Sequence, residues 1–447
     1  MLLLKNFRAV VLPSRSRLLH TYEMPKPLPI ADYELKTIEL TAWDGRVYDL
    51  RYMMTELNVF ESMWNNQIQC SLAINDAKNM IRNIPLNGGE LLNLVFKAPD
   101  KGPFIKKFRL HSISDRQLTK EREMVYILNF VTFEAFLNEK KRTSKSYKGK
   151  KIMDIVADLH YGELGGGALD IEPTDREVHV IIPDIHPTQA INWLCNRAKS
   201  TIWPKGASYL YYQDKDLFRF VTLESRLALG PSAIYIMHTG NVWPDGVQNV
   251  KEDETAARHY NFDFHSDMLD NTRTGMYANE LLTHSQVRKI WRRYTWDYVD
   301  TWLDYSHLYK IMPHHLWPPA ADSFGSWKKK DNKLKLHSTG QDDWPFSPED
   351  WIRPRLSQLQ QANNIRITLV VPGDSDMTVG KVVEFTLPSP EPLDESNFIV
   401  IDRWYRGKWL VTGLRHKLVK DEYVTILELI KDSTYRPYNE LESDDFR

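Results

Sequence analysis

Residues 365–388 read IRITLVVPGDSDMTVGKVVEFTLP, and residues 403–432 read RWYRGKWLVTGLRHKLVKDEYVTILELIKD. Together they hold four short runs rich in β-branched and aromatic residues, separated by turn signals such as Pro372-Gly373 and Arg406-Gly407. Runs of this kind between proline and glycine are typical of antiparallel strands. We therefore expect strands over residues 365–371, 380–387, 408–419 and 422–430.

Alternation within the second run indicates that one face of this sheet is buried. Val383, Phe385 and Leu387 are apolar, whereas Glu384 and Thr386 between them are polar. This period of two predicts a strand with one face in a core and the other in water. Four such strands with short turns favour a closed or nearly closed barrel, because closure removes exposed edges.

Composition places the chain among globular proteins of two to four domains, with 447 residues, 42% hydrophobic and 26% charged. The formal net charge of −1 disfavours a protein that grips nucleic acid along its length. Fourteen Trp and 21 Tyr predict large aromatic contacts within or between subunits. Cys70 and Cys195 lie too far apart in sequence to suggest a disulfide framework or a zinc site.

A second β-rich region occupies residues 37–136. Thr37–Trp43 alternates and ends at Asp44-Gly45, a strong hairpin signal, and Val47–Thr55 supplies the return strand. Asp76 is placed to cap a short helical turn. Further β-rich runs cover residues 57–74, 91–97, 106–114 and 124–133.

Helices and strands alternate in the middle of the chain. Apolar residues at the helical spacing 152, 155, 156 and 159 predict a short amphipathic helix, and a second helix begins near Pro187. A hairpin is expected over 207–224. Residues 310–347, rich in Pro, Trp, His and Lys, are expected to form a long ordered loop, and such loops are usually functional.

No catalytic, cofactor or metal site is predicted. The chain contains no G-x-S-x-G or H-E-x-x-H motif, and Gly165–Gly167 lacks the lysine of a phosphate-binding loop. The adjacent His314 and His315 are better explained as surface or interface histidines than as metal ligands. The alternating set Asp263, His265 and Asp267 is better explained as a solvent-facing strand. A carboxylate pair for glycan cleavage stays open, because acids are plentiful.

Several segments together resemble one known family. They are NVFESMWNN at 58–66, NDAKNMIRNIPL at 75–86, LNFVTFEAFL at 128–137, TGMYANELLTH at 274–284 and VPGDSDMTVGKVVEFTLPS at 371–389. In order and number they look like the baseplate central hub protein of contractile-tailed bacteriophages, related in architecture to the base of type VI secretion spikes. The resemblance spans most of residues 37–307 and 355–432.

The resemblance implies a mainly β fold with α+β insertions: two similar antiparallel β-barrels, or tube-type domains, plus an inserted mixed domain. The implied segments are an N-terminal arm (1–36), a first barrel (37–136), a linker and helices of the mixed domain (137–206), the first hairpin of the second barrel (207–230), an insertion completing the mixed domain (231–362), the rest of the second barrel (363–432) and an acidic tail (433–447).

The N-terminal residues have a second interpretation besides that of an extended arm. Residues 1–22 contain four basic residues and no acid, which also suits a mitochondrial transit peptide. We prefer the arm, mainly because of the resemblance. No run approaches the roughly 18 apolar residues of a membrane span, so no membrane span is expected.

The function that the resemblance implies is structural, without enzymatic activity or cofactors. Three copies would form a ring that adapts a threefold central spike to a sixfold tail tube and surrounds the path of the ejected genome. Implied partners are the spike, the tail tube, the tape measure protein, neighbouring baseplate proteins and DNA in passage. The implied location is the tail baseplate of the virion, after assembly in the host cytoplasm.

Interface candidates come from two places. Lys140–Lys151 holds seven basic residues and no acid, and suits either a solvated linker or a basic strap that contacts a neighbour. The candidate contact residues are Lys145, Lys148, Lys150 and Lys151 in this stretch and Trp317, Trp327 and Trp344 in the long loop. Alternatives are a spike-base subunit of another contractile injection system and, with less support, a peptidoglycan-degrading tail enzyme.

Overall fold

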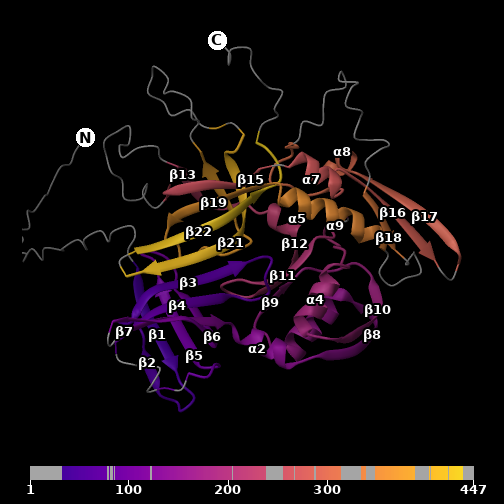
Figure 1. Cartoon of the computed structure of the whole chain (residues 1–447). Helices are drawn as coiled ribbons and strands as arrows, with labels where there is room; N and C mark the ends of the chain where they lie inside the picture. Colours follow the sequence, from indigo (N-terminus) through magenta and orange to yellow (C-terminus); the bar gives the residue numbers. More distant parts are fainter. Residues whose placement is uncertain are drawn as a thin grey trace, which may run out of the picture.

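The computed structural model describes residues 33–77, 80, 84, 86–120, 123–203, 205–237, 255–265, 267–285, 288–313, 334–338, 348–387, 402, 404–420 and 422–435. Strands dominate, and one large mixed sheet runs through both β-rich regions of the chain. The predicted fold class, mainly β with α+β insertions, is confirmed. Figure 1 shows the N-terminal strands below the C-terminal strands, with the mixed part beside them.

The N-terminal β block is an antiparallel sheet in the order β2-β1-β5-β6-β7-β4-β3. Along β5 buried and half-buried residues alternate, as expected of a strand with one face in a core. Asp76 accepts a hydrogen bond from the Met80 amide (2.6 Å) at the predicted helical turn. The strands are β1 (Glu34–Thr41), β2 (Val47–Asp49), β3 (Met54–Ser62), β4 (Gln69–Asp76), β5 (Leu91–Lys97), β6 (Phe104–Lys120) and β7 (Glu123–Val131).

The C-terminal β block contains the four strands predicted from the opening stretches, and all four are confirmed. Three more strands from the inserted part join them, with β13 pairing parallel to β20 and β15 antiparallel to β19. The strands are β13 (Pro231–Met237), β14 (Ala256–Ala257), β15 (His259–His265), β19 (Ile365–Pro372), β20 (Val382–Thr386), β21 (Gly407–Val419) and β22 (Glu422–Lys431).

Strand β21 joins the two blocks into one sheet. One of its edges pairs with β22. The other pairs with β20 over residues 407–410 and with β3 over residues 413–419. The C-terminal block closes into a ring, because residues 256–265 pair with β13 through β14 and with β19 through β15. In the N-terminal block the edge of β3 is taken by β21 rather than by β1 or β2. The blocks therefore protect part of each other's edges.

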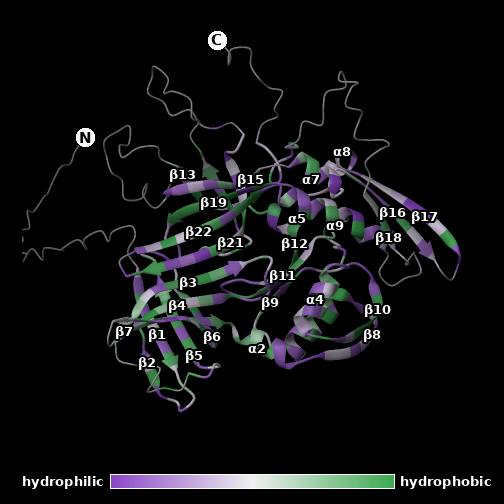
Figure 2. Cartoon of the chain, in the orientation of Figure 1, coloured by the Kyte–Doolittle hydropathy of each residue, from purple (hydrophilic) through white to green (hydrophobic). Residues whose placement is uncertain are grey.

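Each block has its own hydrophobic core, but residues from the C-terminal part of the chain also contribute to the N-terminal core. Leu418 and Tyr423, at the tip of the β21–β22 hairpin, belong to the core of the N-terminal block. Tyr423 packs edge-on against Phe96 with ring centroids 5.6 Å apart. Figure 2 shows short hydrophobic and hydrophilic segments alternating along these strands. The N-terminal core is thus completed by residues near the end of the chain.

The first part of the mixed region packs helices against two small sheets, β10-β8 and β11-β12-β9. Both predicted helices, α3 and α4, are confirmed. The elements are α2 (Phe133–Lys140), β8 (Thr143–Lys151), α3 (Ile152–Asp158), the π-helix η1 (Leu159–Glu163), β9 (Leu169–Ile171), β10 (Glu177–Ile185), α4 (Pro187–Cys195), β11 (Tyr209–Gln213), β12 (Phe218–Thr222) and α5 (Leu223–Leu227).

The hairpin β11–β12 differs from its expected place in the second barrel. It pairs with β9 in a separate sheet, and β13 is the strand that joins the C-terminal block. Its alternate side chains serve two cores: Tyr211 packs in the mixed region, whereas Tyr212 packs with the C-terminal block. Sequence periodicity marks such a strand as buried on both faces but does not say which sheet it joins.

The second part of the mixed region is a projecting sheet in the order β17-β16-β18 beside a long helix (Figure 1). The predicted pairing of residues 274–284 with 289–298 is confirmed, but the expected loop 310–347 contains strand β18. No helix in the described part of the chain could span a membrane. The elements are α7 (Met268–Arg273), β16 (Ala278–Ser285), β17 (Ile290–Asp297), α8 (Tyr298–Thr301), the 3-10 helix η2 (Trp302–Asp304), β18 (Leu334–Ser338) and α9 (Pro348–Ala362).

Candidate functional site

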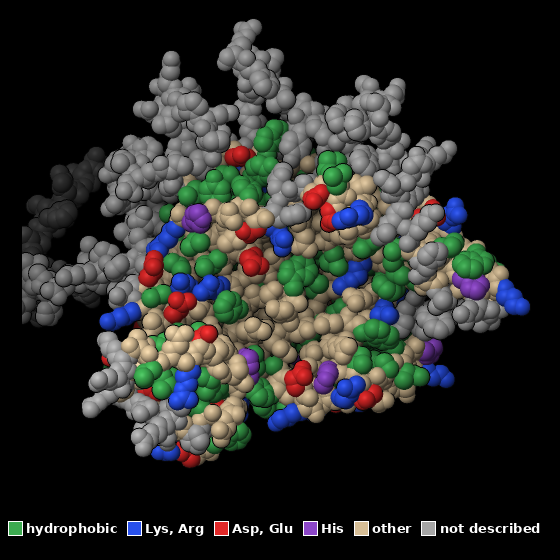
Figure 3. Space-filling view, in the orientation of Figure 1, with side chains coloured by type: hydrophobic (Ala, Val, Ile, Leu, Met, Phe, Trp, Pro, Cys, Tyr) green, Lys and Arg blue, Asp and Glu red, His purple; other side chains and the backbone are tan. Residues whose placement is uncertain are grey.

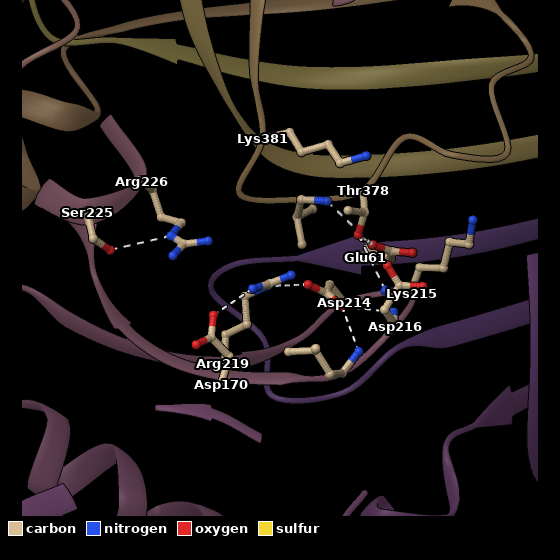
Figure 4. Close-up of polar contacts among 12 residues, drawn as sticks. Glu61, Asp170, Asp214, Lys215, Asp216, Arg219, Ser225, Arg226, Thr378 and Lys381 are labelled. Carbon is tan, nitrogen blue, oxygen red and sulfur yellow. Dashed lines mark hydrogen bonds and ion pairs between the residues drawn. The ribbon is translucent and has the colours of Figure 1, made fainter. Parts of the chain in front are cut away.

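The turn between β11 and β12, residues 214–217, lies between the two β blocks and contacts both. On the N-terminal side, the Lys106 ammonium donates hydrogen bonds to the backbone carbonyls of Asp214 (3.2 Å) and Lys215 (2.9 Å). On the C-terminal side, the Lys215 ammonium donates to the Ser375 carbonyl (2.9 Å) and to Asp376 Oδ1 (3.0 Å). We call this meeting point of three parts of the chain the junction (Figure 4).

Asp214 shapes the turn that enters the junction. Its buried Oδ1 accepts hydrogen bonds from the amides of Asp216 and Leu217, both at 2.8 Å. A side chain that caps its own turn in this way fixes the backbone locally. Arg219 pairs with the other oxygen of Asp214 and with Asp170 (2.7 Å), so the buried charge of Asp214 is compensated.

The two blocks also bond directly to each other across the junction. Ser375 accepts from the Ala98 amide (3.0 Å) and donates to the Gly102 carbonyl (2.7 Å). The Gly102 amide donates to Asp376 Oδ2 (2.9 Å). A Cβ atom on Gly102 would lie 2.7 Å from an oxygen of Asp376, so only glycine allows this approach without a shift.

Glu61 is a second buried acid of the junction. Its Oε2 accepts from the Thr378 hydroxyl (2.5 Å) and from the Val379 amide (3.4 Å), across 317 positions of sequence in the first case. Its Oε1 has no hydrogen-bond partner among the described residues. Burial raises the pKa of Glu61 to about 7, although the hydrogen bond from Thr378 and the charge of Lys106 act to lower it.

The other charged groups of the junction respond to the same burial. Burial lowers the pKa of Lys106, against the attraction of Glu61. Burial alone would raise the pKa of Asp376, but the hydrogen bond from Gly102 and the contact with Lys215 hold it below its ordinary value. The junction is therefore a dehydrated polar network whose charges are held by directional partners.

The chemistry available at the junction is that of a structural joint. Its carboxylates accept from backbone amides and basic side chains and are not arranged around a nucleophile. Within the described residues no group of three or more His, Cys, Asp or Glu side chains could hold a metal ion. Asp267 caps α7 instead, accepting from the Leu269 amide at 3.0 Å, and Asp263 accepts from Asn261 (2.9 Å). His314 and His315 lie outside the described residues.

The predicted interface lysines lie away from the junction, on strand β8. Lys148, Lys150 and Lys151 are exposed there, whereas Lys145 pairs with Glu163 (2.5 Å) and Asp158 (3.4 Å). This stretch, for which a solvated linker and a basic strap were the two interpretations, is a strand paired with β10. Whether these lysines contact a neighbour stays a prediction. Trp317, Trp327 and Trp344 lie outside the described residues.

Sequence reasoning missed the junction residues, although one signal was present. Leu57, Val59 and Glu61 are alternate residues of the segment that forms β3, and all three are buried. An acid on the inward face of a strand predicts a specific buried partner. The partner itself, Thr378, could not be inferred, because nothing local links positions so far apart.

Comparison with known proteins points to one class. No protein-family model matches the chain. The chain is 20% identical over 443 residues to the probable baseplate hub protein gp334 of Vibrio phage KVP40, covering 92% of this chain and 97% of that protein. The resemblance to phage baseplate hub proteins predicted from sequence motifs is therefore confirmed. By its name the relative is a component of a phage baseplate.

Two solved structures share the fold. A tail protein from Neisseria meningitidis MC58 has a TM-score of 0.54 at 11% identity, covering 90% of this chain and 97% of its own. The 43 kDa tail protein of prophage MuSo2 from Shewanella oneidensis also has a TM-score of 0.54, at 9% identity, covering 89% and 99%. The arrangement of β blocks and mixed region is thus a fold found in phage tail proteins.

Proposed function

We propose that this chain is the hub subunit of a phage tail baseplate and that three copies form a ring between the central spike and the tail tube. The main support is the end-to-end resemblance to a baseplate hub protein. The ring would sit at the tail baseplate of the virion, after assembly in the host cytoplasm, and would surround the channel through which the genome leaves.

Within this proposal the two β blocks are the two tube-type domains of each subunit. The β3–β21 pairing and the junction hold them in one orientation. Three subunits with two such domains each would present about six similar positions around one axis, which would match a sixfold tube to a threefold spike. The mixed region, assembled from residues on both sides of β13, would lie beside the second domain.

The charge distribution suits a conduit for DNA. Formal net charge is −1, and Figure 3 shows basic and acidic side chains interspersed over the described part of one face. A lumen without a strong positive field would let the genome pass, because phosphate binding depends mainly on basic side chains. The exposed Lys148, Lys150 and Lys151 of β8 are proposed to contact a neighbouring subunit or baseplate protein.

The deciding experiment measures the mass of the purified full-length protein in solution, alone and mixed with the spike and tail tube proteins of the same phage. We expect a species of three times the 52.4 kDa chain mass and its co-elution with both partners. Negative-stain images should show a ring. A chain that stays monomeric and binds neither partner would contradict the proposal, as would clearing of peptidoglycan in a zymogram.

A further inference from the structure

Residues 302–311 lie along the C-terminal end of β22 and are tied to it by polar contacts. The Leu308 amide donates to Asp432 Oδ1 (3.2 Å), and the Tyr309 amide donates to the Ser433 hydroxyl (2.7 Å). The Thr434 amide donates to the Ile311 carbonyl at 3.0 Å. We call residues 302–311 the clasp segment. It connects the projecting sheet of the mixed region to the last strand of the C-terminal block.

The clasp segment contains a histidine whose two ring nitrogens both face acceptors. His307 Nδ1 lies 2.8 Å from Asp432 Oδ2, and Nε2 lies 2.9 Å from the Trp302 carbonyl. A carboxylate and a carbonyl only accept, so both nitrogens must carry a proton for both hydrogen bonds to form. The ring also stacks on the Trp302 indole with centroids 3.6 Å apart. This geometry requires the imidazolium form.

Behind the clasp segment, a small cavity is lined by an acid without a donor. Glu224 of α5 is 2% exposed, and neither of its carboxyl oxygens has a hydrogen-bond partner among the described residues. The neighbouring Ser208 hydroxyl donates to Gln358 Oε1 (2.6 Å); its proximity to Glu224 acts to lower the pKa of that acid but is outweighed by burial. An ionised carboxylate without donors is costly in such a place, so the closed geometry favours the protonated acid.

In the closed geometry none of the groups that line this cavity donates a hydrogen bond to Glu224. From the clasp segment come His307 and Tyr305, and from β22 comes Asp432. Tyr305 Oη has no partner among the described residues. From α9 come Gln361 and Gln358, and Gln358 Nε2 also has no partner among the described residues. Arg355 of α9 lies outside the lining and donates from Nη1 to the carbonyls of Ala207 (3.0 Å) and Tyr209 (2.9 Å).

A second acid near Glu224 is already satisfied. Glu172 accepts from the Thr222 amide (2.8 Å) and from Ser200 (2.6 Å). Its negative charge disfavours a second anion at Glu224, while Arg355 acts in the opposite sense. The arrangement therefore compensates one buried acid, Glu172, and leaves the other, Glu224, to be neutral.

We propose that the clasp segment is a proton-controlled device: it closes on β22 while Glu224 and His307 are both protonated, and it loosens when these protons are lost. In the closed state the mixed region is held against the C-terminal block. In the loosened state water enters the cavity to solvate the Glu224 carboxylate. The device needs no ligand besides protons.

The acid–base properties of the two residues agree with this geometry. Burial raises the pKa of Glu224 from 4.5 to about 7. Burial alone would lower the pKa of His307, but its hydrogen bond to Asp432 and the charge of that carboxylate raise it above the ordinary 6.5. In both cases the closed state binds the proton more tightly than an open one. The stability of the closed state is therefore greatest at low pH and falls as pH rises through neutrality.

Hydrogen exchange of the full-length protein tests the device. Amide protection over residues 302–311, corrected for the intrinsic effect of pH on exchange, should fall at least tenfold between pH 5.5 and pH 8, since one pKa unit corresponds to a factor of ten. In the Glu224→Gln variant, which keeps the shape and removes the titration, most of this fall should disappear. The matched control is Glu177→Gln on the exposed face of β10, which should behave as wild type.

A second variant keeps the test decisive if Glu224→Gln does not fold. His307→Asn removes the imidazolium, and protection over 302–311 should then already be low at pH 5.5, with the rest of the chain unchanged. Equal protection at both pH values in the wild type, or an unchanged pH dependence in Glu224→Gln, would overturn the proposal. These outcomes are independent of the mass measurement that tests the ring.

Discussion

The junction and strand β8 both carry lysines, but they use them in opposite ways. Lys106 and Lys215 at the junction are largely buried and donate to carbonyls of other parts of the chain. Lys148 and Lys150 on β8 point into water. A buried ammonium with fixed acceptors constrains the backbones around it, whereas an exposed one adds little to stability. The junction lysines therefore hold parts of this subunit together, whereas the β8 lysines are exposed to solvent.

The largest effect should come from the hairpin tip that completes the N-terminal core. Tyr423→Ala removes a fully buried ring and its hydrogen bond to His416 Nδ1 (2.8 Å). Loss of a buried aromatic side chain costs about 3–5 kcal/mol. Denaturant unfolding should show that loss, and exchange should rise in β5 although the change is in β22. Tyr52→Ala, at a residue 91% exposed, is the control, and a loss below about 1 kcal/mol for Tyr423→Ala would contradict the shared core.

Removing a buried lysine of the junction should destabilise the protein more than removing an exposed lysine of β8. Lys106→Met keeps the length of the side chain and deletes both donations to the β11–β12 turn. Each lost hydrogen bond from a charged group costs about 1.5–3 kcal/mol, partly offset because the buried charge is also removed, so we expect a net loss of about 2–3 kcal/mol. Lys148→Met on β8 should change the free energy of unfolding by less than about 0.5 kcal/mol. Equal effects of the two changes would remove the distinction.

Glu61 should make the junction sensitive to pH. Because its pKa rises from 4.5 to about 7 on folding, the stability it contributes is complete below pH 4.5 and is lost as pH rises to about 7. Glu61→Gln should flatten this part of the pH profile and raise stability at pH 8 by about 3 kcal/mol. Thermal unfolding from pH 5 to pH 8 measures it. A variant profile parallel to that of the wild type would show that Glu61 is not the titrating group.

Substitutions on β8 should have the smallest effect on stability and the largest effect on assembly. Reversing Lys148, Lys150 and Lys151 to Glu should leave the free energy of unfolding within about 0.5 kcal/mol of wild type. If these side chains contact a neighbour, the fraction of trimer or of tube-bound protein should fall, as measured by light scattering and co-elution. The same reversal at the exposed Lys36, Lys107 and Lys420 outside β8 is the control. Unchanged assembly would show that these β8 lysines are not contact residues.

Local patterns were enough to predict the elements but not their partners. The alternation around Val383 and the spacing of apolar residues in α3 report on one face of one element, and the structure contains both elements. The hairpin β11–β12 joins a different sheet from the one predicted. Both of its faces are buried, so its sequence pattern is compatible with either sheet. The strand β18 was hidden in a stretch whose composition resembles that of a loop.

By itself, the sequence determined the mainly β character, the two β-rich regions, the helices at 152 and 187 and the likeness to hub proteins. These follow from periodicity, turn residues and short motifs, which act over a few positions. Only the tertiary structure decided that β21 pairs with β3, that Tyr423 completes the first core and that Glu61 meets Thr378. Those contacts join residues hundreds of positions apart, and their free energy depends on burial that exists only once the chain has folded.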